Sequence, residues 1–136
     1  ADEVAQAMAR AFGEALGMAF QIQDDLLDFD RFATTGKPTG IDVKEQKMTL
    51  PLIHALSMAN ASQRREMVGI VKKKNNDQRA VASLMSTVVE LGGVRYAVKR
   101  MRQWQDEALT HLQALPDSAS KESLKALVDF VASRRS

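Results

Sequence analysis

Three aspartates, Asp24, Asp25 and Asp28, form the pattern D-D-x-x-D inside a stretch with helical periodicity. Residues four apart in a helix lie one turn apart on the same face, so Asp24 and Asp28 share a face that Asp25 flanks. Carboxylates held this closely repel one another. Mg²⁺ relieves such repulsion, because it prefers oxygen ligands and is often held by one or two carboxylates together with substrate phosphates. One interpretation of the pattern is therefore that these three residues are metal ligands.

Two lysines follow the aspartates at positions suited to binding an anion. Lys37 lies in a stretch punctuated by Gly and Pro, and Lys47 lies where the next helix is expected to begin. Lysine ammonium groups beside a metal site supply fixed positive charge for the same phosphate oxygens. The alternative is a solvated helix end whose aspartates pair with neighbouring Lys or Arg, and D-D-x-x-D alone does not separate the two interpretations.

The residues around these groups narrow the choice. Phe20 and Gln21 stand one turn before the aspartates, and G-K-P-x-G-x-D and E-x-K-x-T-L-P follow them in that order. This combination resembles the C-terminal part of the trans-type polyprenyl synthetases, also called isoprenyl diphosphate synthases. The resemblance is dense from Ala15 to Leu56 and looser beyond. It implies an all-α chain that forms part of the helical bundle of the isoprenoid synthase fold.

The resemblance also implies a reaction. Members of this family join an allylic prenyl diphosphate to isopentenyl diphosphate: the diphosphate leaves, an allylic cation forms, isopentenyl diphosphate attacks it and a proton is lost. Stabilising the departing polyanion needs Mg²⁺ and fixed positive charge, and it needs no covalent nucleophile. The roles that the resemblance implies are metal binding by Asp24, Asp25 and Asp28, catalysis by Asp24, Asp25, Gln21 and Lys37, and substrate binding by Phe20, Gln21, Lys37 and Lys47.

Two features of the chain depart from the family pattern. Gln46 stands where the family usually has Gly between Glu and Lys, which is expected to stiffen that turn and to leave its neighbours in place. The family also uses another aspartate-rich motif on a facing helix, and these 136 residues contain no other D-D-x-x-D. We therefore expect residues 1–136 to be the C-terminal portion of a polyprenyl synthetase domain without its N-terminal half, and to be inactive alone.

Three alternatives compete with a synthase of medium- or long-chain products. The stretches G-K-P-T-G-I-D-V-K-E and T-L-P-L-I-H-A-L favour that branch, and a short-chain synthase making farnesyl or geranylgeranyl diphosphate is the runner-up. A non-catalytic partner subunit of a heteromeric synthase is disfavoured, because it would not need to keep the aspartates and both lysines. A helical domain without any site is the third alternative.

The composition excludes several other classes of protein. The chain has no Cys, which rules out a disulfide framework and a Cys-based zinc site and is consistent with the cytoplasm, where we expect the protein to be. A net charge of +2 is too small to indicate a nucleic-acid partner. No stretch has the length and composition of a transmembrane helix. The resemblance implies a homodimer or higher oligomer, and absent helices would leave apolar faces that favour association.

The elements that must position these residues are predicted to be helices, since no strand periodicity is present. The first is expected from near Asp2 to about Phe29, which would place its aspartates near the negative C-terminal end. Turn-forming residues predict a loop from Arg31 to Lys47: Thr34, Thr35, Gly36, Pro38, Gly40 and Asp42. On this basis, removal of Asp24 or Asp28 is expected to lower turnover far more than stability, because repulsion at the helix end would be relieved.

The remaining helices are predicted from their caps and breakers, which gives five or six helices in all. Each is expected to start after a capping residue, a proline or a glycine, and to end at a breaker. Their expected extents are from Thr49, from Ser62 to about Lys73, from Gln78 to Leu91 after the cap Asp77, from Val94 to Leu115, and from Ser118 or Ser120 to Arg134 and Arg135.

Overall fold

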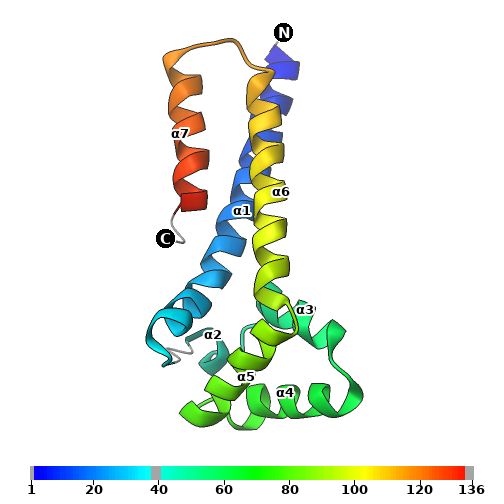
Figure 1. The fold of residues 1–136 in the computed structure, drawn as a ribbon. Coiled ribbons are helices and arrows are strands. Elements are labelled where there is room, and N and C mark those ends of the chain that lie inside the picture. Colours follow the sequence, from blue (N-terminus) through cyan, green and yellow to red (C-terminus); the bar gives the residue numbers. More distant parts are fainter. Residues whose placement is uncertain (1, 38–40, 134–136) are drawn as a thin grey trace. The chain divides into compact units, whose positions relative to one another are not determined.

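Helices are the regular secondary structure of residues 2–37 and 41–133, which are the residues that this computed structural model describes (Figure 1). In chain order they are α1 (Asp2–Thr35), α2 (Ile41–Lys44), α3 (Leu50–Met58), α4 (Ala61–Lys73), α5 (Gln78–Glu90), α6 (Gly93–Gln113) and α7 (Ala119–Ser133). The expected all-α fold is confirmed, and the described residues form seven helices because α2 adds one turn inside the expected loop. Within this part of the chain no single helix is long and apolar enough to cross a membrane, although the bent pair of α5 and α6 meets the length and composition criteria together.

Two compact units share these helices. Ala1–Asp24 and Val98–Ser136 form the first unit, and Asp25–Ala97 forms the second, so α1 and α6 each contribute to both. In the first unit, parts of α1 and α6 pack with α7 around a buried core that consists of Phe12, Ala15, Ala108, Leu112 and Val128. Arg134 and Arg135, expected at the end of the last helix, lie outside the described residues.

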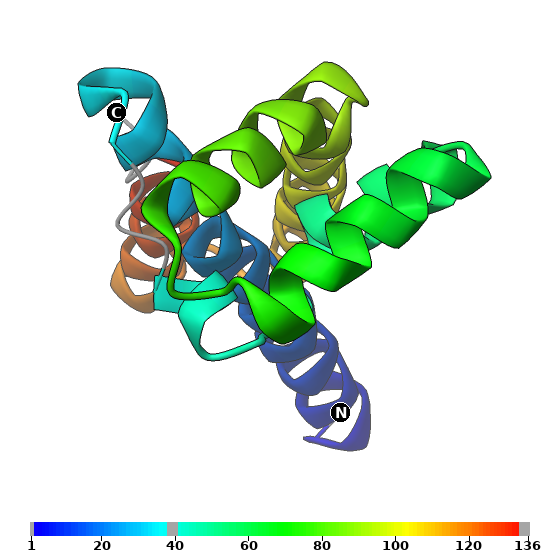
Figure 2. The ribbon, with the colours of Figure 1, turned by 90° about the horizontal axis from the view of Figure 1, so that it is seen from below.

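The core of the second unit lies where α5 packs against α3 and α4 (Figure 2). Apart from one phenylalanine, its buried side chains are aliphatic or methionine: Phe29, Val43, Leu52, Ala55, Ala59, Met67, Ile70, Val71, Val81, Leu84, Met85 and Val88. Val43 belongs to the short helix α2, and Phe29 belongs to α1. The same core therefore anchors both the acidic helix and the segment that follows it.

The end of α1 differs from the expectation of a helix that stops at Phe29. The helix continues to Thr35, and Gly36 ends it with an N–H that donates to the carbonyl of Phe32 at 2.8 Å. The hydroxyls of Thr34 and Thr35 donate to the carbonyls four residues earlier, at 3.1 and 2.9 Å, so the residues interpreted as a turn extend the helix. The three aspartates consequently lie in the helix interior, and the expected penalty from a negative helix end does not apply to them. Pro38 and Gly40, also interpreted as turn residues, lie outside the described residues.

The caps of α4 and α5 come from residues next to each helix. Asn60, and not Ser62, caps α4: its side chain accepts from the N–H of Gln63 at 2.8 Å, and the Gln63 amide oxygen accepts from the N–H of Asn60 at 3.0 Å. Asp77 caps α5 as expected, and its carboxylate accepts from the first-turn N–H groups at 3.0 and 3.2 Å. Both caps satisfy backbone donors that have no partner inside the helix.

Gly93 opens α6 at a point where two backbones meet. A Cβ atom built on Gly93 would lie 2.3 Å from the carbonyl oxygen of Pro51 and 2.8 Å from Cγ1 of Val88. Real Cβ atoms essentially never approach another heavy atom closer than 3.0 Å. The start of α6 therefore approaches α3 closely because residue 93 has no side chain.

Candidate functional site

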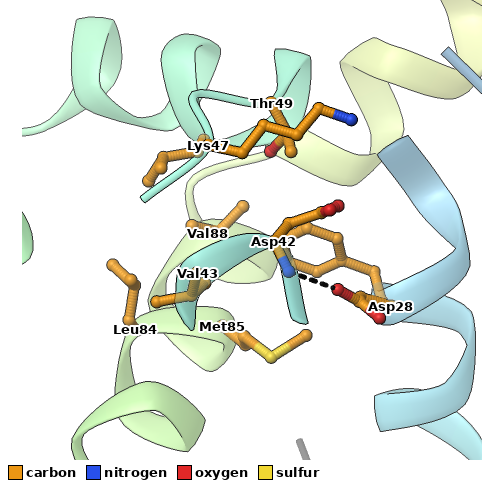
Figure 3. Close-up of a pocket in the computed structure, with 10 residues that line it drawn as sticks. Asp28, Asp42, Val43, Lys47, Thr49, Leu84, Met85 and Val88 are labelled. Atoms are coloured by element: carbon orange, nitrogen blue, oxygen red, sulfur yellow. Dashed lines mark hydrogen bonds between the residues drawn. The ribbon is translucent and has the colours of Figure 1, made fainter. Parts of the chain in front are cut away.

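Asp28 is nearly buried, and its carboxylate is tied to the start of α2. Its exposed fraction is 7%, and its Oδ2 accepts a hydrogen bond from the backbone N–H of Asp42 at 3.1 Å (Figure 3). Asp42 lies in the first turn of α2, where backbone N–H groups lack partners within the helix. Asp28 thus acts as a helix cap from a distant part of the chain.

Asp25 makes the equivalent contact with the next helix. Its Oδ2 accepts from the backbone N–H of Leu50, the first residue of α3, at 3.1 Å. Thr49, at the N-cap position, makes no side-chain capping bond. The other oxygen of Asp25 lies 3.1 Å from Nζ of Lys47. Asp25 therefore caps α3 and also forms an ion pair with Lys47, one of the two lysines identified from the sequence.

The backbone of Lys47 is held by the turn that ends α2. The N–H of Lys47 donates to the carbonyl of Asp42 at 2.8 Å, and the N–H of Gln46 donates to the carbonyl of Val43 at 2.9 Å. This pair of bonds is the Schellman motif, in which the residue before the last donor takes a left-handed conformation. Gln46 has a φ of 57°, which costs a side-chain-bearing residue about 1 kcal/mol more than glycine. The departure from Gly noted in the sequence thus falls at the left-handed position itself.

A small cavity lies between this segment and the core of the second unit. Its volume is about 10 Å³, which is room for about one water molecule, and its wall is mainly apolar (Figure 3). The residues lining it are Asp28, Phe29, Asp42, Val43, Lys47, Thr49, Leu52, Leu84, Met85 and Val88. A prenyl diphosphate does not fit such a space.

The other residues singled out from the sequence are exposed. On the part of α1 that belongs to the first unit, Phe20 has an exposed fraction of 45%, and Gln21 and Asp24 are exposed as well. Lys37 is exposed in the second unit, and its backbone N–H and carbonyl both lie 3.1 Å from the Thr35 hydroxyl. The structure therefore brings Lys47 to an aspartate and leaves Lys37 with backbone contacts at the end of α1.

The donor set fits a metal that is shared with a phosphate. Residues 2–37 and 41–133 contain no group of three or more His, Cys, Asp or Glu side chains arranged to hold a metal ion. Asp25 and Asp28 nevertheless carry hard carboxylate oxygens one turn apart on one helix. Both oxygens of Asp25 and Oδ2 of Asp28 already contact Leu50, Lys47 and Asp42, so a metal would have to share or displace these contacts. Mg²⁺ is commonly bound through one or two carboxylates and completed by water and substrate phosphates, and these residues match that pattern better than an all-protein cage.

Two residues near the aspartates have features that the sequence interpretation did not assign. The Asp42 backbone donates to Asp28, although Asp42 was interpreted only as a turn residue. Gln23 is fully buried, and its amide makes no hydrogen bond within the described residues. The signal for Gln23 was available, because it stands four residues after Ala19 and three before Leu26, and both of these are buried on α1.

Comparisons with known proteins agree with this architecture. The sequence model of the polyprenyl synthetase family matches residues 1–88. The chain is 33% identical over 124 residues to the short chain isoprenyl diphosphate synthase of Methanothermobacter thermautotrophicus, and 32% identical over 124 residues to the octaprenyl diphosphate synthase of Escherichia coli. Each alignment covers 90% of this chain and 38% of the relative.

Solved structures give the same result. The decaprenyl diphosphate synthase of Rhodobacter capsulatus superposes with a TM-score of 0.84 at 30% identity, over 97% of this chain and 40% of that one. The geranylgeranyl pyrophosphate synthase of Bacteroides thetaiotaomicron superposes with a TM-score of 0.80 at 37% identity, over 94% and 42%. The chain thus spans about two fifths of the length of these relatives. With the family model matching more than half of its residues, this chain belongs to the polyprenyl synthetase family.

Proposed function

We propose that the protein carrying this chain is a trans-prenyltransferase that condenses an allylic prenyl diphosphate with isopentenyl diphosphate. The observation that carries the proposal is the match of residues 1–88 to the polyprenyl synthetase family. Within that stretch Nζ of Lys47 lies 3.1 Å from the Asp25 carboxylate, in a turn fixed by backbone bonds; this pairing alone would also occur in a helix end without a metal site. In the proposed site, the Lys47 ammonium would contact phosphate oxygens while the Asp25 carboxylate would supply an oxygen ligand for Mg²⁺. The relatives named above are prenyl diphosphate synthases.

In the proposed reaction the residues of this chain bind and orient the leaving diphosphate. Asp24, Asp25 and Asp28 supply oxygen ligands for Mg²⁺, which when bound acts as a Lewis acid on the diphosphate oxygens. Lys47, with Lys37, adds positive charge that does not have to reorganise when the leaving group departs. Two further contacts follow from the family resemblance: Phe20 lies beside the substrate, and the carbonyl dipole of Gln21 lies near the developing cation.

The proposed product is a medium- or long-chain polyprenyl diphosphate. Relatives at similar identity include an octaprenyl synthase of Escherichia coli and a solanesyl-diphosphate synthase of rice, at 32% and 33%. The short-chain alternative is kept because a short chain isoprenyl diphosphate synthase matches at 33%. Chromatography of the dephosphorylated products separates the two, since the longest prenyl alcohol formed reports the chain length directly.

We also propose that residues 1–136 are the C-terminal portion of a longer synthase and are inactive alone, because they match only 38–42% of the relatives cited above. The test compares two purified proteins, residues 1–136 and the natural gene product that carries them. Each is incubated with farnesyl diphosphate, labelled isopentenyl diphosphate and Mg²⁺. Labelled prenyl product is expected only from the gene product, and chelation of the metal should abolish it. Product formation by residues 1–136 contradicts the fragment proposal, and a gene product that is inactive in every arm contradicts the proposed reaction.

A non-catalytic partner subunit is the second candidate, and one observation favours it. Asp25 and Asp28 cap α3 and α2, so a subunit without activity would still keep both aspartates for its stability. Their presence therefore does not by itself indicate catalysis. Mixing the gene product with an active synthase separates the candidates, because a partner subunit alters the rate or product length of that synthase and forms no product of its own. Light scattering on the same samples tests the expected homodimer or higher oligomer.

A further inference from the structure

The conformation of Gln46 needs support that glycine would not need. Gln46 occupies the left-handed position of the Schellman motif that ends α2, with a φ of 57°. Glycine is the usual residue at such a position because it lacks the Cβ atom that makes this conformation unfavourable. A glutamine that persists there is expected to make a contact that offsets the unfavourable backbone.

Its side chain makes that contact at the end of α4. Nε2 of Gln46 donates to the carbonyl of Val71 at 3.2 Å and to that of Lys72 at 3.4 Å. Both carbonyls belong to the last turn of α4, where helix carbonyls lack partners within the helix. The side chain of Gln46, which follows α2, therefore caps the C-terminus of α4.

A second amide makes the reverse contact. Nδ2 of Asn75, which follows α4, donates at 2.9 Å to the carbonyl of Lys44, the last residue of α2. The C-terminal ends of α2 and α4 are thus capped by amides from each other's flanking residues. Two hydrogen bonds therefore connect the turn between Lys44 and Lys47 to the end of α4. One is donated by the Gln46 side chain, and the other is accepted by the Lys44 carbonyl.

We propose that Gln46 and Asn75 are positioning residues that hold Lys47 where it binds the substrate diphosphate. Lys47 directly follows Gln46, and its Nζ reaches Asp25 at 3.1 Å from a backbone that the Gln46 turn orients. The proposal rests on the proposed function of Lys47. Glycine at position 46 could not make the side-chain bonds to α4. We call the contacts of Gln46 and Asn75, which join the turn carrying Lys47 to the end of α4, the clamp.

The first test uses the natural gene product with Gln46→Gly and with Asn75→Ala. Gln46→Gly removes the clamp and at the same time relieves the backbone, so its thermal stability should change little. Affinity for inorganic pyrophosphate with Mg²⁺, measured by calorimetry, and the KM for the allylic diphosphate should each weaken about threefold or more, with a smaller change in kcat. Asn75→Ala should act in the same direction without altering backbone preference. Gln63→Ala is the matched control, since it removes the side-chain bond to the Asn60 N–H at the other end of α4 and should leave pyrophosphate affinity unchanged.

A double-mutant cycle with Lys47→Ala separates positioning from general destabilisation. If the clamp acts through Lys47, Gln46→Gly should cause no further loss of pyrophosphate affinity once Lys47 is alanine. An equal loss in both backgrounds, or no loss from Gln46→Gly when Lys47→Ala does weaken binding, overturns the positioning role and leaves the proposed function standing. If Lys47→Ala itself leaves pyrophosphate affinity unchanged, both the positioning role and the assignment of Lys47 are wrong.

Discussion

Helices α4 and α5 are capped by residues beside them, whereas α2 and α3 are capped by the acidic helix α1. The caps of α4 and α5 join residues two or three apart in the chain. The caps of α2 and α3 join residues 14 and 25 apart, through Asp28 and Asp25. A cap from a neighbour stabilises one helix, while a cap from α1 also fixes where that helix stands relative to the aspartates.

This difference gives two of the three aspartates a second role. Asp25 and Asp28 hold the starts of α3 and α2, on either side of Lys47, in addition to their proposed role as metal ligands. Asp24 is exposed on α1. The three positions of one motif should therefore respond differently to substitution, and the local caps provide the reference against which to measure that response.

The largest loss of stability is expected for Asp28→Ala. The change leaves the partly buried N–H of Asp42 without its charged acceptor, which should lower the free energy of unfolding by about 2 kcal/mol in urea titrations without metal. Asp28→Asn keeps an acceptor oxygen and should lose less. This reverses, for Asp28, the expectation from the sequence that its removal would spare stability. An Asp28→Ala protein as stable as the wild type would show that the contact with Asp42 contributes nothing.

Asp25→Ala is expected to cost somewhat less. It removes the cap of α3, typically worth about 1 kcal/mol, and a partly exposed ion pair that adds little. Affinity for pyrophosphate should fall too, because Lys47 loses the partner that orients it. Asp25→Asn is the comparison, since its amide oxygen can still accept from Leu50 while the charge that attracts Lys47 is gone. Identical pyrophosphate affinities for the wild type and both variants would contradict the link between cap and lysine.

Removing a local cap should affect stability alone. Asp77→Ala leaves two first-turn N–H groups of α5 without their acceptor and is expected to lower the free energy of unfolding by about 1 kcal/mol. The affinity for pyrophosphate with Mg²⁺ should not change. A variant that loses stability as Asp25→Ala does, yet also loses pyrophosphate affinity, would erase the distinction between local caps and caps from α1.

The smallest effect on stability is expected for Asp24→Ala. Its carboxylate is exposed, and its loss relieves repulsion within the acidic helix. Thermal unfolding of the metal-free protein should match the wild type within error, while binding of pyrophosphate in the presence of Mg²⁺ weakens. Normal Mg²⁺-dependent binding by Asp24→Ala would remove Asp24 from the proposed metal ligands.

The caps that could be predicted from the sequence are the local ones. Asp77 was identified because a capping residue next to its helix is a short-range signal. For α4 the same reasoning named Ser62 as the cap and did not consider Asn60, although the spacing of Asn60 and Gln63 matches a capping box. The end of α1 was missed because Thr34 and Thr35 are turn formers in most settings, and here their hydroxyls bond within the helix.

The contacts from α1 could not be predicted in the same way. Whether Asp28 meets Asp42, or Asp25 meets Leu50, depends on how the core around Val43 and Leu52 brings α2 and α3 back to the acidic helix. Periodicity and capping preferences describe neighbouring residues only, so they do not predict contacts between residues far apart in the chain. The family resemblance suggested that Lys47 binds phosphate, whereas its ion pair with Asp25 is seen only in the structure.

Two adjacent glycines stand at the junction of α5 and α6, and each is constrained for a different reason. Gly92 has a φ of 85°, so its constraint is torsional, and an asparagine should be its best replacement. Gly93 is constrained by volume, because any added atom meets the carbonyl of Pro51. Substitutions at the junction of α5 and α6 should therefore be tolerated better at residue 92 than at residue 93. A side chain at residue 93 would require α3 to shift.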